Sequence, residues 1–371
     1  MRLSTTVLTC LLAVSVHSKA AESAFLASET AKLKIDTVAS GLSHPWGIAF
    51  LPDGRMLVTE RDGRLRIVSA DGKLGAPIAG LPPIAVNGQG GLLDVLLDKD
   101  FATNQKIYLS FAEPGPNNTN STAVLSATLQ DSNLENSQVI FSQTPKYDSK
   151  YHFGGRLVQE QSGNLFVTLG DRATQRADVQ PLNTLIGKVA RITATGKAAE
   201  GNPFTADKTA LAEIWSVGHR NIQGATLDPQ GRLWTHEHGP QGGDEINITA
   251  AGKNYGWPLI TYGEEYGGGV IGKTSQTGLE QPMHYWVPSI APSGMSFYQA
   301  PLFKTWQNNL LVGSLKFGQL VRLEIKDDKV VHEERIRIGS RIRDVQVGPD
   351  GAVYLLTDED DGKILKLTPL P

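Results

Sequence analysis

Hydrophobic and polar residues alternate along this chain in short runs, and the same phrase occurs four times. Each copy has a tight turn that ends in glycine, an apolar run of about five residues and a polar turn, which predicts a short β-strand. The four turns are Pro52-Asp53-Gly54, Gln161-Ser162-Gly163, Pro229-Gln230-Gly231 and Pro349-Asp350-Gly351. In the first and last copies a second apolar run follows Asp62-Gly63 or Asp361-Gly362, which is typical of a β-hairpin.

The spacing of these turns predicts the architecture. The turn glycines are 109, 68 and 120 residues apart, which suits two, one and two units of roughly 55–65 residues, or about six units in all. Short repeated strands predict an all-β fold, a six-bladed β-propeller with four-stranded antiparallel blades. A pair of β-sandwiches is the alternative, but the length and number of the units favour the propeller. Only residues 23–33 have a pattern that permits a short helix, and we expect a single domain over residues 21–371.

The N-terminus has the pattern of a secretory signal. Arg2 is followed by an apolar run over residues 7–16, and Ser18 and Ala20 are the small residues that a cleavage after position 20 requires. We expect residues 1–20 to be a cleaved signal peptide; a buried N-terminal helix or strand is the alternative. The only cysteine, Cys10, lies in this segment, so the mature chain would have no thiol chemistry.

Composition excludes several classes of protein. The 371 residues are 40% hydrophobic and 20% charged, which is typical of an ordinary globular chain. The net charge of −3 argues against a broad basic surface for nucleic acid. No strand–GxGxxG–helix unit is present to bind a nicotinamide cofactor, and no later run is apolar enough for a membrane-spanning helix.

Residues 219–258 carry the densest chemistry, with three His, an Arg-Asn pair, an Asp-Glu pair and a run of glycines. Glycines allow a ligand to approach the backbone, and carbonyl and carboxylate oxygens suit calcium. Glu245 and Tyr255 lie here, although their spacing is not that of an EF-hand. His236 and His238 resemble half of a zinc site, but no third nitrogen or thiolate ligand is evident.

A second candidate centre combines a base with a carboxylate. His152 precedes one predicted strand and Asp171 follows the next, so Asp171 could orient His152 as a general base. A structural histidine and a turn aspartate are the alternatives. Gln89 stands between glycines and could either bind a ligand or belong to a simple turn.

Cationic and amide side chains come from three distant segments: Arg220, Asn221, Lys316, Arg341 and Arg343. Arg341 and Arg343 alternate, so both would project to one face of a strand. A solvated strand face is one interpretation. If all five residues converge on the central channel, they would instead form a positive pocket for a ligand with several carboxylates.

Together these motifs resemble those of the soluble quinoprotein sugar dehydrogenases, most closely the aldose sugar dehydrogenase branch. The matching phrases span most of the mature chain in the family's order: HPWGIAFLPDGRMLVTERDGRL, GQGGLLDV, HFGGRLV, GHRNIQG, EHGPQGGDEIN, GKNYGWP and RIRDVQVGPDG. The resemblance implies a periplasmic six-bladed propeller that oxidises aldoses at C1 by hydride transfer to pyrroloquinoline quinone (PQQ), a planar tricarboxylate.

The resemblance also implies roles for single residues. His152 would be the base that takes the proton of the anomeric hydroxyl, steadied by Asp171. The carbonyls of Gly239 and Pro240 would bind the calcium that polarises the quinone, and Glu245 with Tyr255 would form a second, structural calcium site. The residues that would hold PQQ are Gln89, Arg220, Asn221, Tyr266, Lys316, Arg341, Ile342 and Arg343.

One departure from the family concerns the substrate. The soluble glucose dehydrogenases have an acidic residue just before the base, whereas this chain has Tyr151 and fewer loop insertions. We therefore expect a more open site and broad oxidation of aldoses, including disaccharides. A calcium-dependent propeller hydrolase such as a lactonase, and a non-catalytic sugar-binding propeller, are the rival interpretations. The sequence identifies no electron acceptor and does not decide between a monomer and a calcium-linked homodimer.

Overall fold

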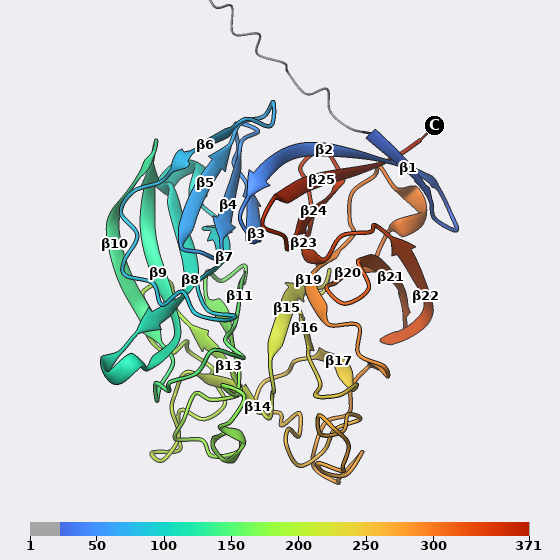
Figure 1. Cartoon of the computed structure of the whole chain (residues 1–371). Coiled ribbons are helices and arrows are strands. Elements are labelled where there is room, and N and C mark those ends of the chain that lie inside the picture. Colours follow the sequence, from blue (N-terminus) through green and yellow to red (C-terminus); the bar gives the residue numbers. More distant parts are fainter. Residues whose placement is uncertain (1–22, 371) are drawn as a thin grey trace, which may run out of the picture.

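The computed structural model describes residues 23–370, and the predicted signal peptide lies outside the described residues. The strands form six antiparallel sheets around a central channel, each with four strands and one with a fifth strand at its edge (Figure 1). The prediction of a six-bladed, all-β propeller with four-stranded blades is therefore confirmed.

Three blades come from the first half of the chain. Blade 1 has the strands β3 (Pro45–Phe50), β4 (Met56–Glu60), β5 (Arg64–Val68) and β6 (Leu74–Pro77). Blade 2 has β7 (Leu92–Leu97), β8 (Lys106–Pro114), β9 (Asn120–Gln130) and β10 (Asn133–Ser142). Blade 3 has β11 (Gly154–Gln159), β12 (Leu165–Leu169), β13 (Lys188–Ile192) and β14 (Ile214–Val217).

The second half supplies the other blades. Blade 4 has β15 (Ile222–Leu227), β16 (Leu233–Glu237), β17 (Asp244–Ile248) and β18 (His284–Trp286), and blade 5 has β19 (Pro292–Phe297), β20 (Leu310–Ser314), β21 (Gln319–Lys326) and β22 (Lys329–Arg337). Blade 6 has β23 (Ile342–Val347), β24 (Val353–Thr357) and β25 (Gly362–Pro369). Short helical turns lie in the connections: α1 (Phe101–Asn104), η1 (Pro116–Asn118), η2 (Arg176–Asp178) and η3 (Lys304–Trp306).

An N-terminal strand completes blade 6 and closes the ring. β2 (Lys32–Leu42) pairs antiparallel with β25, and β1 (Ser23–Ala27) adds an edge strand (Figure 1). The short helix that the pattern permits over residues 23–33 therefore does not form. Leu33 and Ile35 are buried whereas Lys32 is exposed, which is the period of two that a strand requires. Pairing with the C-terminal strand β25 stabilises this conformation.

The first strands of the six blades form the wall of the channel, since each contacts the first strand of the next blade around the complete ring. Each first strand has a register shift against its partner, typical of a β-bulge. The third residue of each strand is either glycine or charged, in the order Gly47, Asp94, Arg156, Gly224, Gly294 and Asp344. The hydrophobic core lies between the blades, as where Leu57 and Leu65 of blade 1 belong to one buried cluster with Leu109 of blade 2.

Candidate functional site

A cavity of about 410 Å³ opens at one end of the channel. Every blade contributes to its lining, which comprises Trp46, Arg61, Gln89, Leu93, Phe153, Gly154, Asn221, Gln223, His238, Ala291, Leu315, Lys316, Arg341, Arg343 and Asp358. The fold thus brings Gln89, Asn221, Lys316, Arg341 and Arg343 together, as the sequence predicts for a ligand pocket. The side chain of Ile342 packs instead in the hydrophobic cluster between blades 5 and 6.

The cavity has a surplus of positive charge. Four cationic side chains, Arg61, Lys316, Arg341 and Arg343, line it against the single carboxylate of Asp358. The Asp358 carboxylate lies 3.1 Å from Arg341 Nη2 and 3.3 Å from Arg343 Nη2. Burial by itself raises the pKa of Asp358, but the surrounding cations hold that pKa well below its usual range. Arg61 also reaches Asp358, at 3.6 Å, so three cations share one carboxylate and the lining has a net charge of +3.

Sequence reasoning missed Arg61 and Asp358 because both stand in turns. A signal was present, however. In the four repeated phrases, the residue seven or eight positions after the turn glycine reaches this end of the propeller: Arg61, Asp171, His238 and Asp358.

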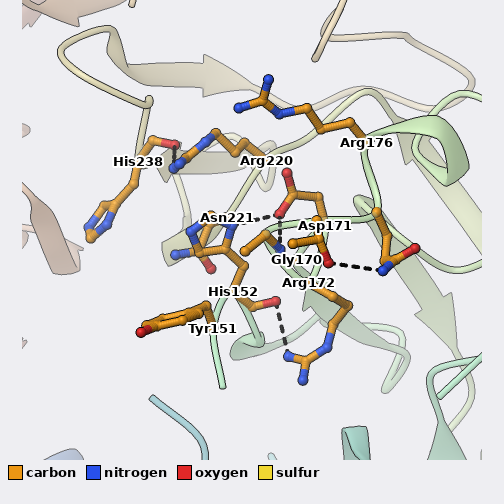
Figure 2. Close-up of polar contacts among 12 residues, drawn as sticks. Tyr151, His152, Gly170, Asp171, Arg172, Arg176, Arg220, Asn221 and His238 are labelled. Carbon is orange, nitrogen blue, oxygen red and sulfur yellow. Dashed lines mark hydrogen bonds and ion pairs between the residues drawn. The ribbon is translucent and has the colours of Figure 1, made fainter. Parts of the chain in front are cut away.

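His152 and Asp171 form a buried pair beside the cavity (Figure 2). His152 Nδ1 lies 2.6 Å from Asp171 Oδ1, and the other carboxylate oxygen accepts a hydrogen bond of 2.8 Å from the indole of Trp257. Gln89 Oε1 accepts a 2.9 Å hydrogen bond from the backbone of His152, which connects His152 to the cavity wall. Because an ionised Asp171 accepts a hydrogen bond from Nδ1–H, Nε2 of His152 is left as the basic nitrogen.

Burial lowers the pKa of His152, Asp171 opposes this effect, and the cations of Arg220 and Arg172 reinforce it. The imidazole side chain is only 11% exposed. A lowered pKa keeps the ring neutral at neutral pH, which is the form that a general base requires.

The backbone around His152 is held in an uncommon conformation. Its φ is +52°, and a Cβ on the neighbouring Gly170 would lie 2.1 Å from the His152 carbonyl oxygen, so position 170 requires glycine. Arg172 donates a 3.2 Å hydrogen bond to this carbonyl and lies 3.6 Å from the centre of the Phe153 ring. Burial lowers the pKa of Arg172 to about 9. Sequence reasoning missed Arg172, which holds the backbone carbonyl of His152.

Arg220 and Asn221 connect this pair to the loop after β16. Arg220 Nη1 donates a hydrogen bond of 3.1 Å to the carbonyl of His238 (Figure 2). It donates a second one, of 2.8 Å, to the carbonyl of Gly239. Asn221 Oδ1 accepts a hydrogen bond of 3.3 Å from the backbone of Gly154. The predicted anion-binding pair and a predicted metal-binding carbonyl are thus direct neighbours.

Glu245 lies in a small hollow that Glu237, Gly239 and Tyr255 also line. Burial and the nearby carboxylates of Glu237 and Asp244 raise the pKa of Glu245 well above its usual value. Glu237 is bonded to His219 Nδ1 at 2.9 Å, whereas the hydrogen bond from Asn247 to Glu245 is long, at 3.5 Å. The hollow therefore has two carboxylates, Glu237 and Glu245, against one guanidinium, that of Arg220.

The hydroxyl of Tyr255 is already engaged within the protein, because it donates a hydrogen bond of 2.6 Å to the carbonyl of Ile248. The two histidines of the THEHGP segment are engaged with backbone carbonyls across the blade boundary, His236 with Ser293 and His238 with Pro292. Burial lowers their pKa values to about 3 and about 4. Within residues 23–370, no three His, Cys, Asp or Glu side chains are grouped as metal ligands.

Tyr266 lies outside the main cavity. Its side chain is 71% exposed and lines a neighbouring hollow, together with Pro240 and Lys316. Tyr151 is half exposed next to His152 (Figure 2).

The chain matches known proteins over most of its length. The family model described as glucose / sorbosone dehydrogenase matches residues 42–366. Aldose sugar dehydrogenase YliI of Escherichia coli (strain K12) is 45% identical over 348 residues, which cover 91% of this chain and 94% of that protein.

Solved structures are also similar. The apo-form of the soluble aldose sugar dehydrogenase from Escherichia coli superposes with a TM-score of 0.88 at 44% identity, covering 91% of this chain and 100% of that one. The PQQ-bound form of an aldose sugar dehydrogenase from Streptomyces coelicolor gives a TM-score of 0.76 at 27% identity, covering 91% and 98%.

Proposed function

We propose that this chain, which belongs to the glucose/sorbosone dehydrogenase family, oxidises aldose sugars at C1 to lactones by hydride transfer to PQQ. The observation that carries the proposal is the charge of the cavity. Four cations against one carboxylate leave three positive charges for a ligand, which equals the charge of a tricarboxylate, and the buried His152–Asp171 pair lies alongside.

The residues present fit the cofactor. Gln89, Asn221, Lys316, Arg341 and Arg343 line the cavity, whereas Arg220 lines the Glu245 hollow, which shares His238 with the cavity. Guanidinium groups bind carboxylates in bidentate geometry, and Lys adds a mobile positive charge. Ile342 would take part only through its backbone between the two arginines. When bound, the quinone would accept the hydride, and Tyr266 would contribute at most from the rim.

His152 would act as the general base. Its Nε2 would take the proton of the anomeric hydroxyl while the hydride leaves C1, and the sugar would become a lactone. Asp171 would stabilise the imidazolium that forms and hold the ring in one orientation. Arg172 fixes the backbone of the base through the His152 carbonyl.

We infer calcium at two places. The carbonyls of Gly239 and Pro240 are hard oxygen ligands of the kind that calcium prefers, and a cation there would polarise the quinone as a Lewis acid. Glu245, with the backbone of Tyr255, would hold a second, structural ion. The raised pKa of Glu245 and its long hydrogen bond support this site, because a buried carboxylate beside another carboxylate is stabilised by a cation.

We further propose that the protein acts in the periplasm after removal of residues 1–20. In the part of the chain that the structure describes, no helix has the length and apolar character needed to span a bilayer.

Reconstitution of the cofactor-free mature protein tests the proposal. PQQ and calcium would be added, and dye reduction would be followed with a panel of aldoses. Activity should require both additions. His152→Gln should lower kcat by about 10²–10⁴-fold with PQQ binding largely retained, while His332→Gln on the outer strand β22 serves as the matched control.

Two results would count against the proposal. Loss of PQQ binding in a folded His152→Gln protein would contradict the role of this residue as base. Absence of PQQ binding by the unmodified protein would exclude a quinoprotein and favour a calcium-dependent hydrolase, which a lactone-hydrolysis assay would then detect.

A further inference from the structure

We propose that Trp257 is a positioning residue for the oxidation, the third member of a fixed unit with Asp171 and His152. Trp257 lines the Glu245 hollow rather than the cofactor cavity, so it acts through Asp171. The inference rests on the proposed function, because it takes His152 as the base. It adds a residue, 86 positions beyond Asp171 in the chain, on which the rate of proton removal depends.

The two oxygens of the Asp171 carboxylate have different partners. Oδ1 lies 2.6 Å from Nδ1 of His152 and also accepts a 2.7 Å hydrogen bond from the backbone N–H of Ala173. Oδ2 accepts a 2.8 Å hydrogen bond from the indole of Trp257, which is its only donor among residues 23–370. Holding both oxygens fixes the rotation of the carboxylate, so the indole decides how Oδ1 meets the base.

Water cannot take the place of this donor. The side chain of Asp171 is only 1% exposed, so without the indole N–H its Oδ2 would be a buried acceptor with no partner. A buried charged acceptor without a partner is costly, and the carboxylate could regain a donor only by turning. Such a turn would change its contact with His152. We therefore expect the loss of the indole N–H to affect the base.

Trp257 is itself held on several sides. Its backbone N–H donates a 2.9 Å hydrogen bond to the carbonyl of Gly218, and its carbonyl accepts one of 2.7 Å from the side chain of Gln180. The ring is 4% exposed and packs in a buried cluster with Val179 and Ile186, which lie in the connection between β12 and β13. A donor that is fixed by folding needs no reorganisation during the reaction.

The packing around the ring is reinforced by cations. Lys188, the first residue of β13, is completely buried, and its Nζ donates hydrogen bonds of 2.5 and 2.8 Å to the carbonyls of Val179 and Ile186. The guanidinium groups of Arg176 and Arg220 lie 5.1 and 5.4 Å from the centre of the Trp257 ring, within the range of cation–π contacts. The orientation of the indole is thus determined by groups from several loops.

The charges that face His152 show what the indole does to the base. Asp171 raises the pKa of His152, whereas burial and the guanidinium groups of Arg220 and Arg172 lower it. The N–H of Trp257 draws negative charge of the carboxylate toward Oδ2 and away from the imidazole. Trp257 therefore helps to keep the base neutral, and its removal should raise the pKa of His152.

The first test measures turnover of the reconstituted enzyme with glucose. Trp257→Phe should lower kcat about tenfold with little change in KM, because the missing donor affects proton removal and not sugar binding. Trp257→3-benzothienylalanine, which keeps the bicyclic shape and removes only the N–H, should reproduce this loss. Retained kcat in the benzothienylalanine protein would overturn the inference.

Trp215→Phe is the matched control. The indole of Trp215, on the outer strand β14 of blade 3, donates a 3.1 Å hydrogen bond to the carbonyl of Thr249 and has no contact with the base. Its replacement should leave kcat unchanged. An equal loss of kcat in this variant would show a general effect of removing a buried indole and would overturn the specific role of Trp257.

A double-mutant cycle tests whether Trp257 acts through Asp171. Asp171→Asn combined with Trp257→Phe should be only slightly slower than Asp171→Asn by itself, because both substitutions disrupt one unit. If the two losses in kcat multiply instead, Trp257 acts independently of the carboxylate, and the inference is wrong.

A measurement on the cofactor-free protein separates this inference from the proposed function. NMR titration of isotope-labelled histidine follows the ring of His152 without PQQ, calcium or sugar. The pKa of His152 should be higher in Trp257→Phe than in the wild type and in Trp215→Phe. That result would support the positioning role even if no sugar were oxidised. An unchanged or lower pKa, in a protein that does oxidise glucose, would overturn the role and leave the proposed function standing.

Discussion

Two arginine–carboxylate groups lie along the axis of this propeller, one at the mouth and one in the channel beneath it, and Trp46 lies between them. At the mouth, Arg341 and Arg343 share Asp358 in an open cavity of about 410 Å³. In the channel, Arg156 lies 4.3 Å from the Trp46 ring that also lines the cavity. Similar residue types therefore occur in two different settings.

The channel group is closed and internally paired. Arg156 Nη1 lies 3.0 Å from Asp94 and 3.1 Å from Asp344, and the three side chains are almost completely buried. A Cβ on Gly47 would lie 2.7 Å from Asp94 Oδ1, and one on Gly294 would lie 2.0 Å from Asp344 Oδ1, so glycines make room for the carboxylates. Burial raises the pKa of Asp94 to about 6, with Asp344 adding to the effect.

The difference teaches how a ligand site is distinguished from structural charge. In the channel one arginine contacts both carboxylates in a closed space, and burial raises the pKa of each carboxylate, which reduces the negative charge left to balance. At the mouth the cations outnumber the carboxylates and face open volume, which leaves charge for a ligand to complete. Charge balance and enclosure, rather than residue type, support a structural role for the channel group and the proposed binding role for the group at the mouth.

Breaking the channel group should have the largest effect. Arg156→Met would leave two buried carboxylates without a cation, and we expect the free energy of unfolding to fall by about 3–5 kcal/mol at neutral pH. Urea denaturation of the cofactor-free protein measures this loss. A change below about 1 kcal/mol would show that the channel charges do not depend on one another.

The Glu245 hollow sharpens the comparison because its lining has more carboxylates than cations: Glu237 and Glu245 against Arg220. Calcium at 100 times its Kd should stabilise the wild-type protein by about 2.7 kcal/mol, and a chelator should remove this gain. In Glu245→Gln, the thermal midpoint should be nearly insensitive to calcium and chelator. The metal-free variant should be at least as stable as the metal-free wild type, since it lacks the buried carboxylate. An equal calcium response in both proteins would contradict a site at Glu245.

The channel should also contribute to the pH dependence of stability through His236. Its pKa falls from about 6.5 in the unfolded chain to about 3 in the fold, so the unfolded state binds more protons between these values. The contribution of His236 to the free energy of unfolding is therefore fully present above about pH 6.5 and is lost as the pH falls through this window. His236→Gln should reduce the slope of the unfolding free energy by about 1.4 kcal/mol per pH unit. Denaturation between pH 4 and 6.5 tests this, and an unchanged slope would show that His236 is protonated in the fold.

Removing one cation from the mouth should affect binding and leave stability almost unchanged. Lys316→Ala should weaken PQQ affinity about tenfold, whereas the unfolding free energy should change by less than about 0.5 kcal/mol. Titration of PQQ absorbance measures the affinity, and Lys329→Ala on the outer strand of the same blade is the control. A loss of stability without a loss of PQQ affinity would show that Lys316 has a structural role and does not bind PQQ.

Much of the fold could be predicted because local pattern carries it. The repeated turn-and-strand phrase predicts the blades. Gln89 and His152 could be named as candidate site residues because glycines lie beside or close to them, and Arg343 because it alternates with Arg341 along a strand. Residues 23–33 were misassigned because their partner strand, β25, lies at the other end of the chain. Arg61 and Asp358 were missed because, taken one at a time, they are ordinary turn residues.

The sequence by itself determined the repeating strand units, their number and the residue types that reach the mouth, because these depend on hydrogen-bonding period and turn chemistry within a few residues. Only the tertiary structure decided that β2 closes the ring and that Arg156 is internally paired while Arg343 faces a cavity. Both arginines stand on first strands of blades, and their sequence contexts do not distinguish them. Arg156 meets Asp94 across 62 residues of chain. Charge balance at a point in space depends on such distant partners, and folding alone brings them together.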